Sequence, residues 1–169
     1  MAYKVHKFMD DNAIGKRGEA VFKEYLEARG YGYRDVSGDR RYQDDDIDFL
    51  VESKSAPDKT ISVEVKNDTY IARTRNVFFE TMSNVDLETV GCFEKTKADL
   101  MAIVSEPEQL IYFMSTDTLR RYVKKNAAAL RFIPRVPGSN SCGYLVPLAN
   151  ISEHVKTVSY ATSGKGEKK

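Results

Sequence analysis

The sequence predicts an α/β (α+β) domain with a central mixed β-sheet flanked by helices. Three observations lead to this fold class. Residues 13–30 carry apolar side chains at helical spacing, residues 46–52 and 60–67 alternate apolar and polar side chains as strands do, and the apolar runs 100–105 and 109–115 precede a second helical segment. Helices and strands interspersed in this order favour a sheet with helices on its faces.

The first helix is predicted over residues 13–30. It has an apolar stripe of four side chains, Val21, Phe22, Tyr25 and Leu26. Asp11 or Asn12 is suited to cap its start, and Gly30 is suited to end it.

The remaining elements follow from apolar runs and turn residues. Residues 46–52 and 60–67 are expected to form an antiparallel hairpin with a long connection over residues 53–59. Residues 76–83 are the third strand candidate. After it we expect a short helix over 92–99, strands over 100–105 and 109–115, a helix over 117–130 capped by Thr116 or Asp117, and a last strand over 143–148.

Length and composition bound the class of protein. The 169 residues suit one domain, residues 1–161, followed by a disordered basic tail, residues 162–169. A net charge of +1 excludes a highly basic DNA-coating protein, and Cys92 and Cys142 match no metal-binding spacing and no disulfide framework. With no signal peptide and no apolar run of about 20 residues, we expect a cytoplasmic protein that does not cross a membrane.

Charged residues interrupt both strands of the predicted hairpin. Alternation places Glu64 and Lys66 on one face of their strand, and pairing of the two strands brings Asp48 to the same face. Two neighbouring carboxylates repel each other unless a cation compensates them, and hard oxygen ligands suit Mg²⁺ or Mn²⁺. The alternative is a solvated cross-strand ion pair on an open sheet face.

These segments resemble a known family. "DIDFLV" followed by "ISVEVK" resembles the core of the PD-(D/E)xK nuclease superfamily, with Asp48, Glu64 and Lys66 at the motif positions. "GKRGE" resembles the Gly-x-x-Gly-Glu helix start of archaeal Holliday-junction resolvases, with Glu19 as its glutamate. The literal proline of the family name is replaced here by Ile47.

The resemblance implies a restriction-endonuclease-like core and a Mg²⁺- or Mn²⁺-dependent endonuclease that hydrolyses DNA phosphodiester bonds, acting on branched or structured DNA. It assigns catalytic roles to Asp48, Glu64, Lys66 and Glu19. Asp48, Glu64 and the backbone carbonyl of Val65 would bind the metal, with Glu19 completing its shell. Lys66 would orient or deprotonate the attacking water, or stabilise the transition state.

Basic residues around these positions are candidates for contacts with DNA phosphates. They are Arg40, Arg41, Arg73, Arg75, Lys95 and Lys97. Lys97 is the better candidate of the two lysines after the hairpin. A second basic patch on residues 120–125 suits either phosphate or solvent, and Tyr31, Tyr33 and Tyr42 suit either base stacking or packing over the sheet edge.

Glu80 is expected one strand beyond Glu64, where pairing with Arg73 or Arg75 is favoured over metal ligation. Three further readings stay open: a restriction-type or phage recombination and repair nuclease, a catalytically inactive nucleic-acid-binding member of the same fold, and an unrelated α/β protein with surface ion pairs. Cutting both DNA strands usually needs two sites, so a homodimer is open too, with residues 76–82 and 131–138 as interface candidates.

Overall fold

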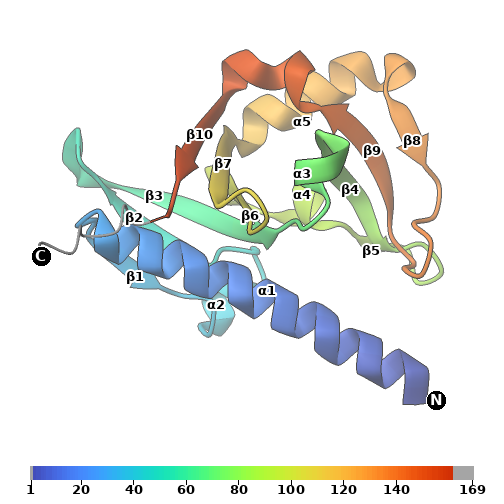
Figure 1. The fold of residues 1–169 in the computed structure, drawn as a ribbon, viewed down its shortest axis with the longest axis horizontal. Coiled ribbons are helices and arrows are strands. Elements are labelled where there is room, and N and C mark those ends of the chain that lie inside the picture. Colours follow the sequence, from blue (N-terminus) through green and yellow to red (C-terminus); the bar gives the residue numbers. More distant parts are fainter. Residues whose placement is uncertain (1, 162–169) are drawn as a thin grey trace, which may run out of the picture.

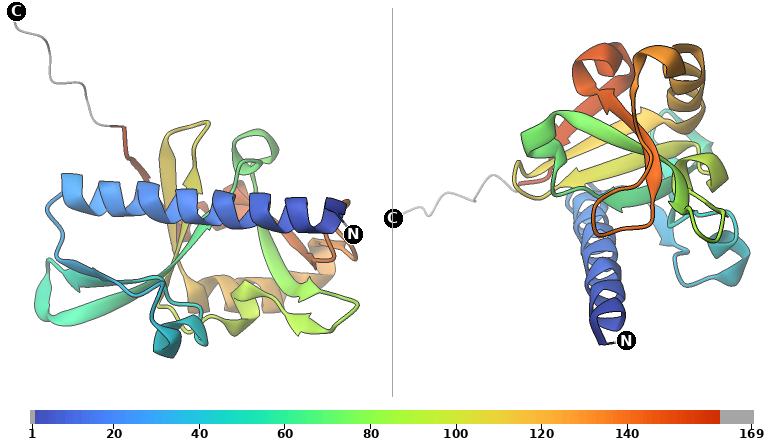
Figure 2. Two further views of the ribbon diagram at one scale, coloured as in Figure 1. Left: turned by 90° about the horizontal axis from the view of Figure 1, so that it is seen from below. Right: turned by 90° about the vertical axis from the view of Figure 1, so that its right-hand side faces the viewer.

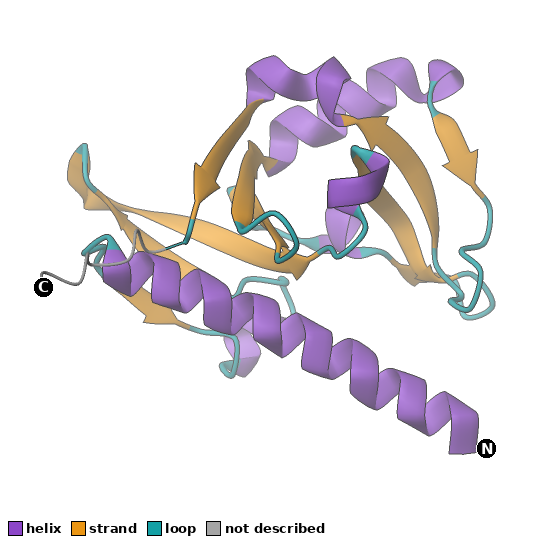
Figure 3. Ribbon diagram, in the orientation of Figure 1, coloured by secondary structure: helices purple, strands orange, loops and turns teal. Residues whose placement is uncertain are grey.

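The chain folds into two sheets with helices around them. The computed structural model describes residues 2–161, with side chains from residue 13 onwards except residue 57. The predicted tail, residues 162–169, lies outside the described residues. The expected α/β class is confirmed, because a six-stranded mixed sheet forms the centre and helices lie against it (Figure 3).

The main sheet contains the predicted hairpin. Its strand order is β1-β2-β3-β6-β7-β10, and all neighbours are antiparallel except β3 and β6, which are parallel. The strands are β1 (Tyr33–Asp35), β2 (Phe49–Ser53), β3 (Ala56–Asn67), β6 (Leu100–Ser105), β7 (Leu110–Ser115) and β10 (Val155–Ser159). The short helix α2 (Arg40–Gln43) lies between β1 and β2 in the chain.

Helix α1 (Ala2–Ala28) covers one face of the main sheet, and its N-terminal half extends beyond the sheet (Figures 1 and 2). The predicted stripe is confirmed, since Phe22, Tyr25 and Leu26 are buried against Phe49 and other apolar residues of the sheet. Gly30 ends the helix in a left-handed conformation (φ 63°), and Tyr31 N–H donates to the Leu26 carbonyl (3.0 Å).

The predicted start of this helix is wrong. The helix begins at Ala2, so Asp11 and Asn12 lie within it and do not cap it. No Pro or Gly stands between Ala2 and Asn12, so nothing in the backbone stops the helix before these residues.

A second sheet and helix α5 (Thr116–Asn126) cover the opposite face. The second sheet has the order β5-β4-β9-β8. Its strands are β4 (Asn76–Asn84), β5 (Thr89–Val90), β8 (Arg131–Ile133) and β9 (Cys142–Pro147). Helices α3 (Ile71–Thr74) and α4 (Cys92–Lys95) and the 3-10 segments η1 (Ala127–Ala129) and η2 (Leu148–His154) complete this half. Val77, Phe79 and Phe93 pack there against Met101 and Ile103 of the main sheet.

Strand β4 therefore differs from its prediction. It belongs to a separate sheet, because the neighbours of β3 are β2 and β6. Its Val77 and Phe79 side chains are buried in the core, so residues 76–82 do not offer these side chains to a partner chain.

Other differences are local. The predicted long hairpin connection is wrong, because Ser53 pairs with Ala56 and only two residues turn the chain. Helix α5 is capped by Ser115, whose hydroxyl accepts from Thr118 N–H (3.4 Å), rather than by Thr116 or Asp117. The short strands β1, β5, β8 and β10 escaped prediction because they are mostly exposed and carry little apolar alternation. None of the described helices is long and apolar enough to span a membrane.

Candidate active site

The β2–β3 hairpin brings Asp48 and Glu64 together. Strand β2 pairs with β3 from Phe49 opposite Val63 onwards, and Asp48 stands one residue before this pairing. The two carboxyl groups lie within hydrogen-bonding reach of each other. The predicted juxtaposition of these two side chains is therefore present in the structure.

Backbone hydrogen bonds hold Asp48 from both sides just before β2 begins. Its N–H donates to the Val63 carbonyl (3.0 Å), and its carbonyl accepts from Val36 N–H (2.8 Å). Its carboxylate also accepts from Val65 N–H (2.9 Å), where β3 runs past the end of β2. The N–H and the carbonyl of a strand residue point to the same neighbour, so the Val65 carbonyl faces the same side as Asp48.

Lys66 lies next to this pair. Its ammonium nitrogen is 3.0 Å from the Glu64 carboxylate, and its side chain is 40% exposed whereas that of Glu64 is 6% exposed. Burial by itself lowers the pKa of Lys66, but attraction to Cys92, Glu64 and Glu80 outweighs it and raises the pKa. Lys66 is therefore a protonated group that lies between the buried carboxylates and solvent.

Burial dominates the titration of both carboxylates. It raises the pKa of Glu64 to about 8, with Lys66 opposing and Asp48 adding to the effect. Burial also raises the pKa of Asp48, although the Val65 N–H and Glu64 favour its ionised form. The half-buried Asp48 and the buried Glu64 are thus both held above their ordinary pKa values, which is the electrostatic condition that a bound cation would relieve.

Helix α1 brings Glu19 to the same end of the hairpin. Burial raises the pKa of Glu19, and the neighbouring Asp48 raises it further, while a hydrogen bond with Ser37 lowers it. The helix approaches β3 closely at Gly18, where a Cβ atom would lie 2.8 Å from the Asn67 Cβ. Gly18, the second glycine of "GKRGE", thus permits the contact that places Glu19 near Asp48.

The turn before Asp48 is tied to α4 and the residues after it. Lys95 lies 2.7 Å from Asp46, and Lys97 lies 2.7 Å from Asp45. Thr96 hydroxyl donates to the Asp46 carbonyl (2.7 Å). These contacts hold Asp46, which has a left-handed φ of 45°, two residues before Asp48.

An open pocket of about 700 Å³ lies beside Lys66, and neither Asp48 nor Glu64 lines it. Lys66 and Lys95 both line it, together with Asp46, Glu80, Ser83, Thr89, Val90 and Cys92. Lys95 therefore faces the same pocket as Lys66, whereas Lys97 lines a different one with Asp99 and Arg120. Which of the two lysines contacts phosphate stays a prediction.

The other predicted phosphate ligands lie apart from this pocket. Arg40 is exposed on α2, and Arg41 beside it pairs with Asp39 (2.6 Å). Arg73 lies over the Tyr70 ring. Of the set, only Lys95 lines the pocket that contains Lys66.

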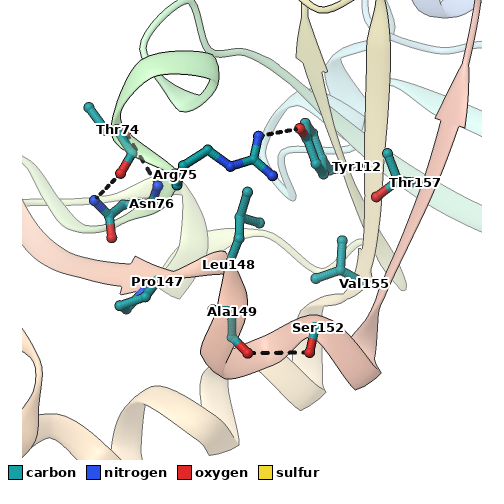
Figure 4. A pocket seen from close by; sticks show the side chains of 10 residues that line it. All are labelled: Thr74, Arg75, Asn76, Tyr112, Pro147, Leu148, Ala149, Ser152, Val155 and Thr157. Carbon is teal, nitrogen blue, oxygen red and sulfur yellow. Dashed lines mark hydrogen bonds between the residues drawn. The ribbon is translucent and has the colours of Figure 1, made fainter.

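Arg75 lines a second cavity, of about 480 Å³ (Figure 4). Its guanidinium lies 2.7 Å from Glu108 and donates to the Tyr112 hydroxyl (3.2 Å). Thr74, Pro147 and Leu148 also line this cavity. Arg75 is thus engaged on the side of η2 and β10 rather than beside Lys66.

Glu80 does not pair with Arg73 or Arg75 as expected. Its carboxylate accepts from Cys92 N–H (3.3 Å), and it lies near enough to Lys66 to raise that pKa. It reaches this position from the second sheet, so strand adjacency in one sheet is not the reason for its proximity.

Arg120 of the second basic patch and the three tyrosines have structural partners, whereas Arg121, Lys124 and Lys125 are exposed. Arg120 donates to the carbonyls of Phe93 (2.6 Å) and Thr96, which ties α5 to α4. Tyr31 and Tyr33 pack against the core under α1, and Tyr42 packs against the cluster that contains Val36. For the tyrosines the packing alternative is confirmed.

The described side chains offer few ligands for a metal ion at the hairpin. Among the described side chains, no group of three or more His, Cys, Asp and Glu is arranged to hold one. Asp48, Glu64 and the Val65 carbonyl nevertheless suit Mg²⁺, which is commonly held by one or two carboxylates and keeps several waters. The contact between the half-buried Asp48 carboxyl group and the buried Glu64 carboxyl group is the observation in favour of this fit.

Two neighbours of the site were not predicted. Ser37 lies within hydrogen-bonding reach of Glu19 and donates to Asp35 (2.8 Å), and Cys92 lies beside Lys66, where burial raises the pKa of its thiol to about 12. Neither belongs to a sequence pattern that marks the site. Ser37 follows strand β1 in the chain, and Cys92 begins helix α4. Lys16, one turn before Glu19, lowers the pKa of that glutamate and could have been noted from its place in "GKRGE".

Comparison with known proteins leaves the family open. No family model matches the sequence, and no curated protein matches it. The chain is similar to a solved structure titled as that of a bacterial homing endonuclease, I-Ssp6803I, over 94% of this chain and 83% of that chain, with 16% sequence identity and a TM-score of 0.48. This level of similarity assigns no family.

Proposed function

We propose that this protein is a Mg²⁺- or Mn²⁺-dependent DNA endonuclease. The observation that carries the proposal is the contact of the half-buried Asp48 carboxyl group with the buried Glu64 carboxyl group, directly beside Lys66. Two neighbouring carboxyl groups taken out of water lower the stability of the fold unless a bound cation compensates their charge. Such pairs are therefore candidates for functional sites. The motif resemblance of the same residues adds phosphodiester hydrolysis as the reaction.

Each residue has a defined task in this proposal. Asp48, Glu64 and the Val65 carbonyl would hold the metal, and Glu19 would complete or orient the shell of ligands around it. A bound divalent ion supplies a water of lowered pKa and charge neutralisation at the phosphate. The Lys66 ammonium lies beside Glu64 and lines the pocket. There it would attract a phosphate oxygen and orient the attacking water.

The class of DNA substrate is a finer part of the proposal. Lys66 and Lys95 face one open pocket and Arg40 is exposed on α2, which suits the phosphate backbone of any DNA. Branched DNA is the leading substrate, and a restriction-type or recombination and repair role is the alternative. A homodimer stays a prediction.

A catalytically inactive nucleic-acid-binding domain is the second candidate. It is favoured by the Glu64–Lys66 ion pair and by the lack of a three-residue metal cluster among the described side chains. The two candidates differ in metal binding, because a structural ion pair needs no divalent cation.

The test is nicking of a supercoiled plasmid beside cleavage of a four-way junction, with Mg²⁺ or Mn²⁺ and with EDTA. We expect metal-dependent cleavage by the wild type and a loss of roughly 100-fold or more in Asp48→Asn, Glu64→Gln and Lys66→Ala. Asp58→Asn and Lys59→Ala, on exposed positions of the same strand β3, are matched controls that should keep full activity. A wild type that cuts no duplex, single-stranded or junction DNA contradicts the endonuclease proposal.

Thermal melting gives a readout that does not depend on cleavage. Mg²⁺ should stabilise the wild type and so raise its melting temperature. At a free Mg²⁺ concentration of 100 times the dissociation constant, the free energy of unfolding should rise by about 2.7 kcal/mol. Asp48→Asn should show little of this gain, and Asp58→Asn all of it. The absence of any gain in the wild type would favour the inactive binding domain, and equal gains in the two variants would mean that the metal binds away from Asp48.

A further inference from the structure

The β4–β5 hairpin, residues 82–90, presents apolar side chains that the core does not use. Leu87 is 74% exposed, Val90 is 52% exposed and Met82 is 38% exposed. Met82 pairs directly with Val90, so these two side chains share one face of the hairpin. Thr89 beside them is also exposed, whereas the Ser83 hydroxyl donates to the Val90 carbonyl (3.3 Å) within the hairpin.

This hairpin is continuous with the candidate active site. Val90, Ser83 and Thr89 line the same pocket as Lys66 and Lys95. In Figure 1 the hairpin lies beyond α4, at the outer end of the second sheet. A DNA duplex with a phosphate at Lys66 would therefore meet the hairpin with its adjacent base pairs.

The hairpin is held in place at its tip. The Asn84 side chain accepts from the N–H groups of Asp86 (3.0 Å) and Leu87 (3.1 Å). The Asp86 carboxylate accepts from Arg135 and from the Asn140 amide (2.9 Å), and Val85 N–H donates to the Asn140 carbonyl (2.8 Å). A braced hairpin loses little conformational entropy on binding, which suits a recognition element.

The chemistry of the hairpin suits base edges rather than phosphates. Apolar side chains contact thymine methyl groups, hydroxyls bond to any base, and a carboxylate accepts from the cytosine amino group. Glu88, exposed at the tip, would be repelled by the DNA backbone, so the hairpin would enter a groove and not lie along the phosphates. The major groove is wide enough for a two-stranded ribbon.

We infer that the β4–β5 hairpin enters the major groove of duplex DNA beside the scissile phosphate and reads base pairs there through Leu87, Val90 and Met82. The inference rests on the proposed endonuclease function and adds sequence selection to it. It favours the restriction-type alternative over branched DNA as the substrate.

The test is selection of cleaved sites from duplexes with randomised positions, using the full-length protein and Mg²⁺. The wild type should prefer certain bases at a few adjacent positions. Leu87→Ser and Val90→Ser should cut the preferred site about tenfold less efficiently and lose part of the preference. Phe132→Ser is the matched control, because Phe132 is 45% exposed on β8 at the opposite edge of the same sheet and should keep the wild-type preference.

Guanine N7 methylation interference, with Ca²⁺ replacing Mg²⁺, checks the groove directly. Methylation in the preferred site should block binding by the wild type and by Phe132→Ser, and should block Leu87→Ser less. Cleavage without sequence preference, or hairpin variants with an unchanged preference, would overturn the inference and leave the endonuclease proposal standing. Absence of both cleavage and binding would remove the proposed function itself.

Discussion

At the scale of single residues, the site is a place where burial and charge oppose each other. Glu64 is 5% exposed and touches both a second acid, Asp48, and a base, Lys66. Burial of Glu64, together with repulsion from Asp48, outweighs the attraction of the single Lys66 ammonium, so the pKa of Glu64 rises to about 8. Residues placed this way reduce stability at neutral pH, which is typical of functional groups rather than of core packing.

This opposition predicts a pH dependence of stability without metal. The folded pKa of Glu64 is about 8 against an ordinary value of 4.5, so the folded state binds its proton more tightly. The contribution is fully present below pH 4.5 and is lost as the pH rises to about 8, with up to about 1.4 kcal/mol for each pH unit in that window. Denaturant unfolding in EDTA at several pH values measures it.

Glu64→Gln should show a much smaller decline and should exceed the wild type in stability at pH 8. Asp58→Asn, exposed on the same strand, should keep the wild-type decline. A wild type that becomes more stable between pH 5 and pH 8 in EDTA would contradict the burial argument.

At the scale of elements, the contact between α1 and β3 decides whether Glu19 reaches the hairpin. Gly18 and Asn67 pack so closely that a side chain on Gly18 has no space. Helix α1 thereby places the Glu19 carboxylate at the end of the hairpin where Asp48 lies.

Gly18→Ala should force α1 away from β3, because its Cβ would lie 2.8 Å from the Asn67 Cβ. We expect a loss of about 1–3 kcal/mol in the free energy of unfolding and a reduced rate of metal-dependent cleavage. Gly15→Ala is the matched control on the same helix, since its Cβ meets nothing within 4 Å. That variant should be more stable than the wild type by about 0.5–1 kcal/mol. Equal effects at the two positions, measured by urea unfolding, would argue against the close contact.

Helix α4 is a single turn, and α5 supports it through Arg120. The guanidinium donates to the Phe93, Glu94 and Thr96 carbonyls, where α4 would otherwise leave acceptors unpaired. Since Lys95 and Thr96 hold the Asp46 turn, this support extends to the site.

Arg120→Ala should therefore lower the free energy of unfolding by about 1.5–3 kcal/mol. Arg121→Ala, on the exposed side of the same helix, should change it by less than about 0.5 kcal/mol. Thermal or denaturant unfolding measures both variants, and a neutral Arg120→Ala would show that α4 does not depend on these hydrogen bonds.

At the scale of the whole molecule, a net charge of +1 gives no general attraction to DNA. Affinity must then come from local positive groups, of which Lys95 lines the candidate pocket. Each phosphate contact makes binding more sensitive to salt.

Lys95→Ala should weaken DNA binding similarly for all sequences and reduce the slope of log affinity against log salt by about 1. Lys156→Ala, exposed on β10 at the far edge of the main sheet, should leave the slope unchanged. Fluorescence anisotropy with Ca²⁺ over a range of salt concentrations measures the slopes. Equal slopes for the wild type and Lys95→Ala would remove Lys95 from the DNA-binding surface.

Local sequence was sufficient for the elements with strong periodicity. The apolar stripe of α1 and the alternation in β2 and β3 predicted these elements and the common face of Glu64 and Lys66. Caps and exposed strands were less predictable, because Ser115 competes with its neighbours for the cap and β10 carries little apolar alternation. The start of α1 was missed because residues such as Asp11 and Asn12 favour a cap but do not require one.

The sequence by itself determined the charged hairpin, since a period of two assigns each side chain to a face once the register is set. Only the tertiary structure decided which separate segments meet there. The second sheet brought Glu80 and Cys92 to Lys66, α4 turned Lys95 rather than Lys97 into the pocket, and Arg75 was drawn away to Glu108. These contacts depend on how two sheets pack across apolar cores, and such long-range packing leaves no periodic signal around the polar residues that it brings together.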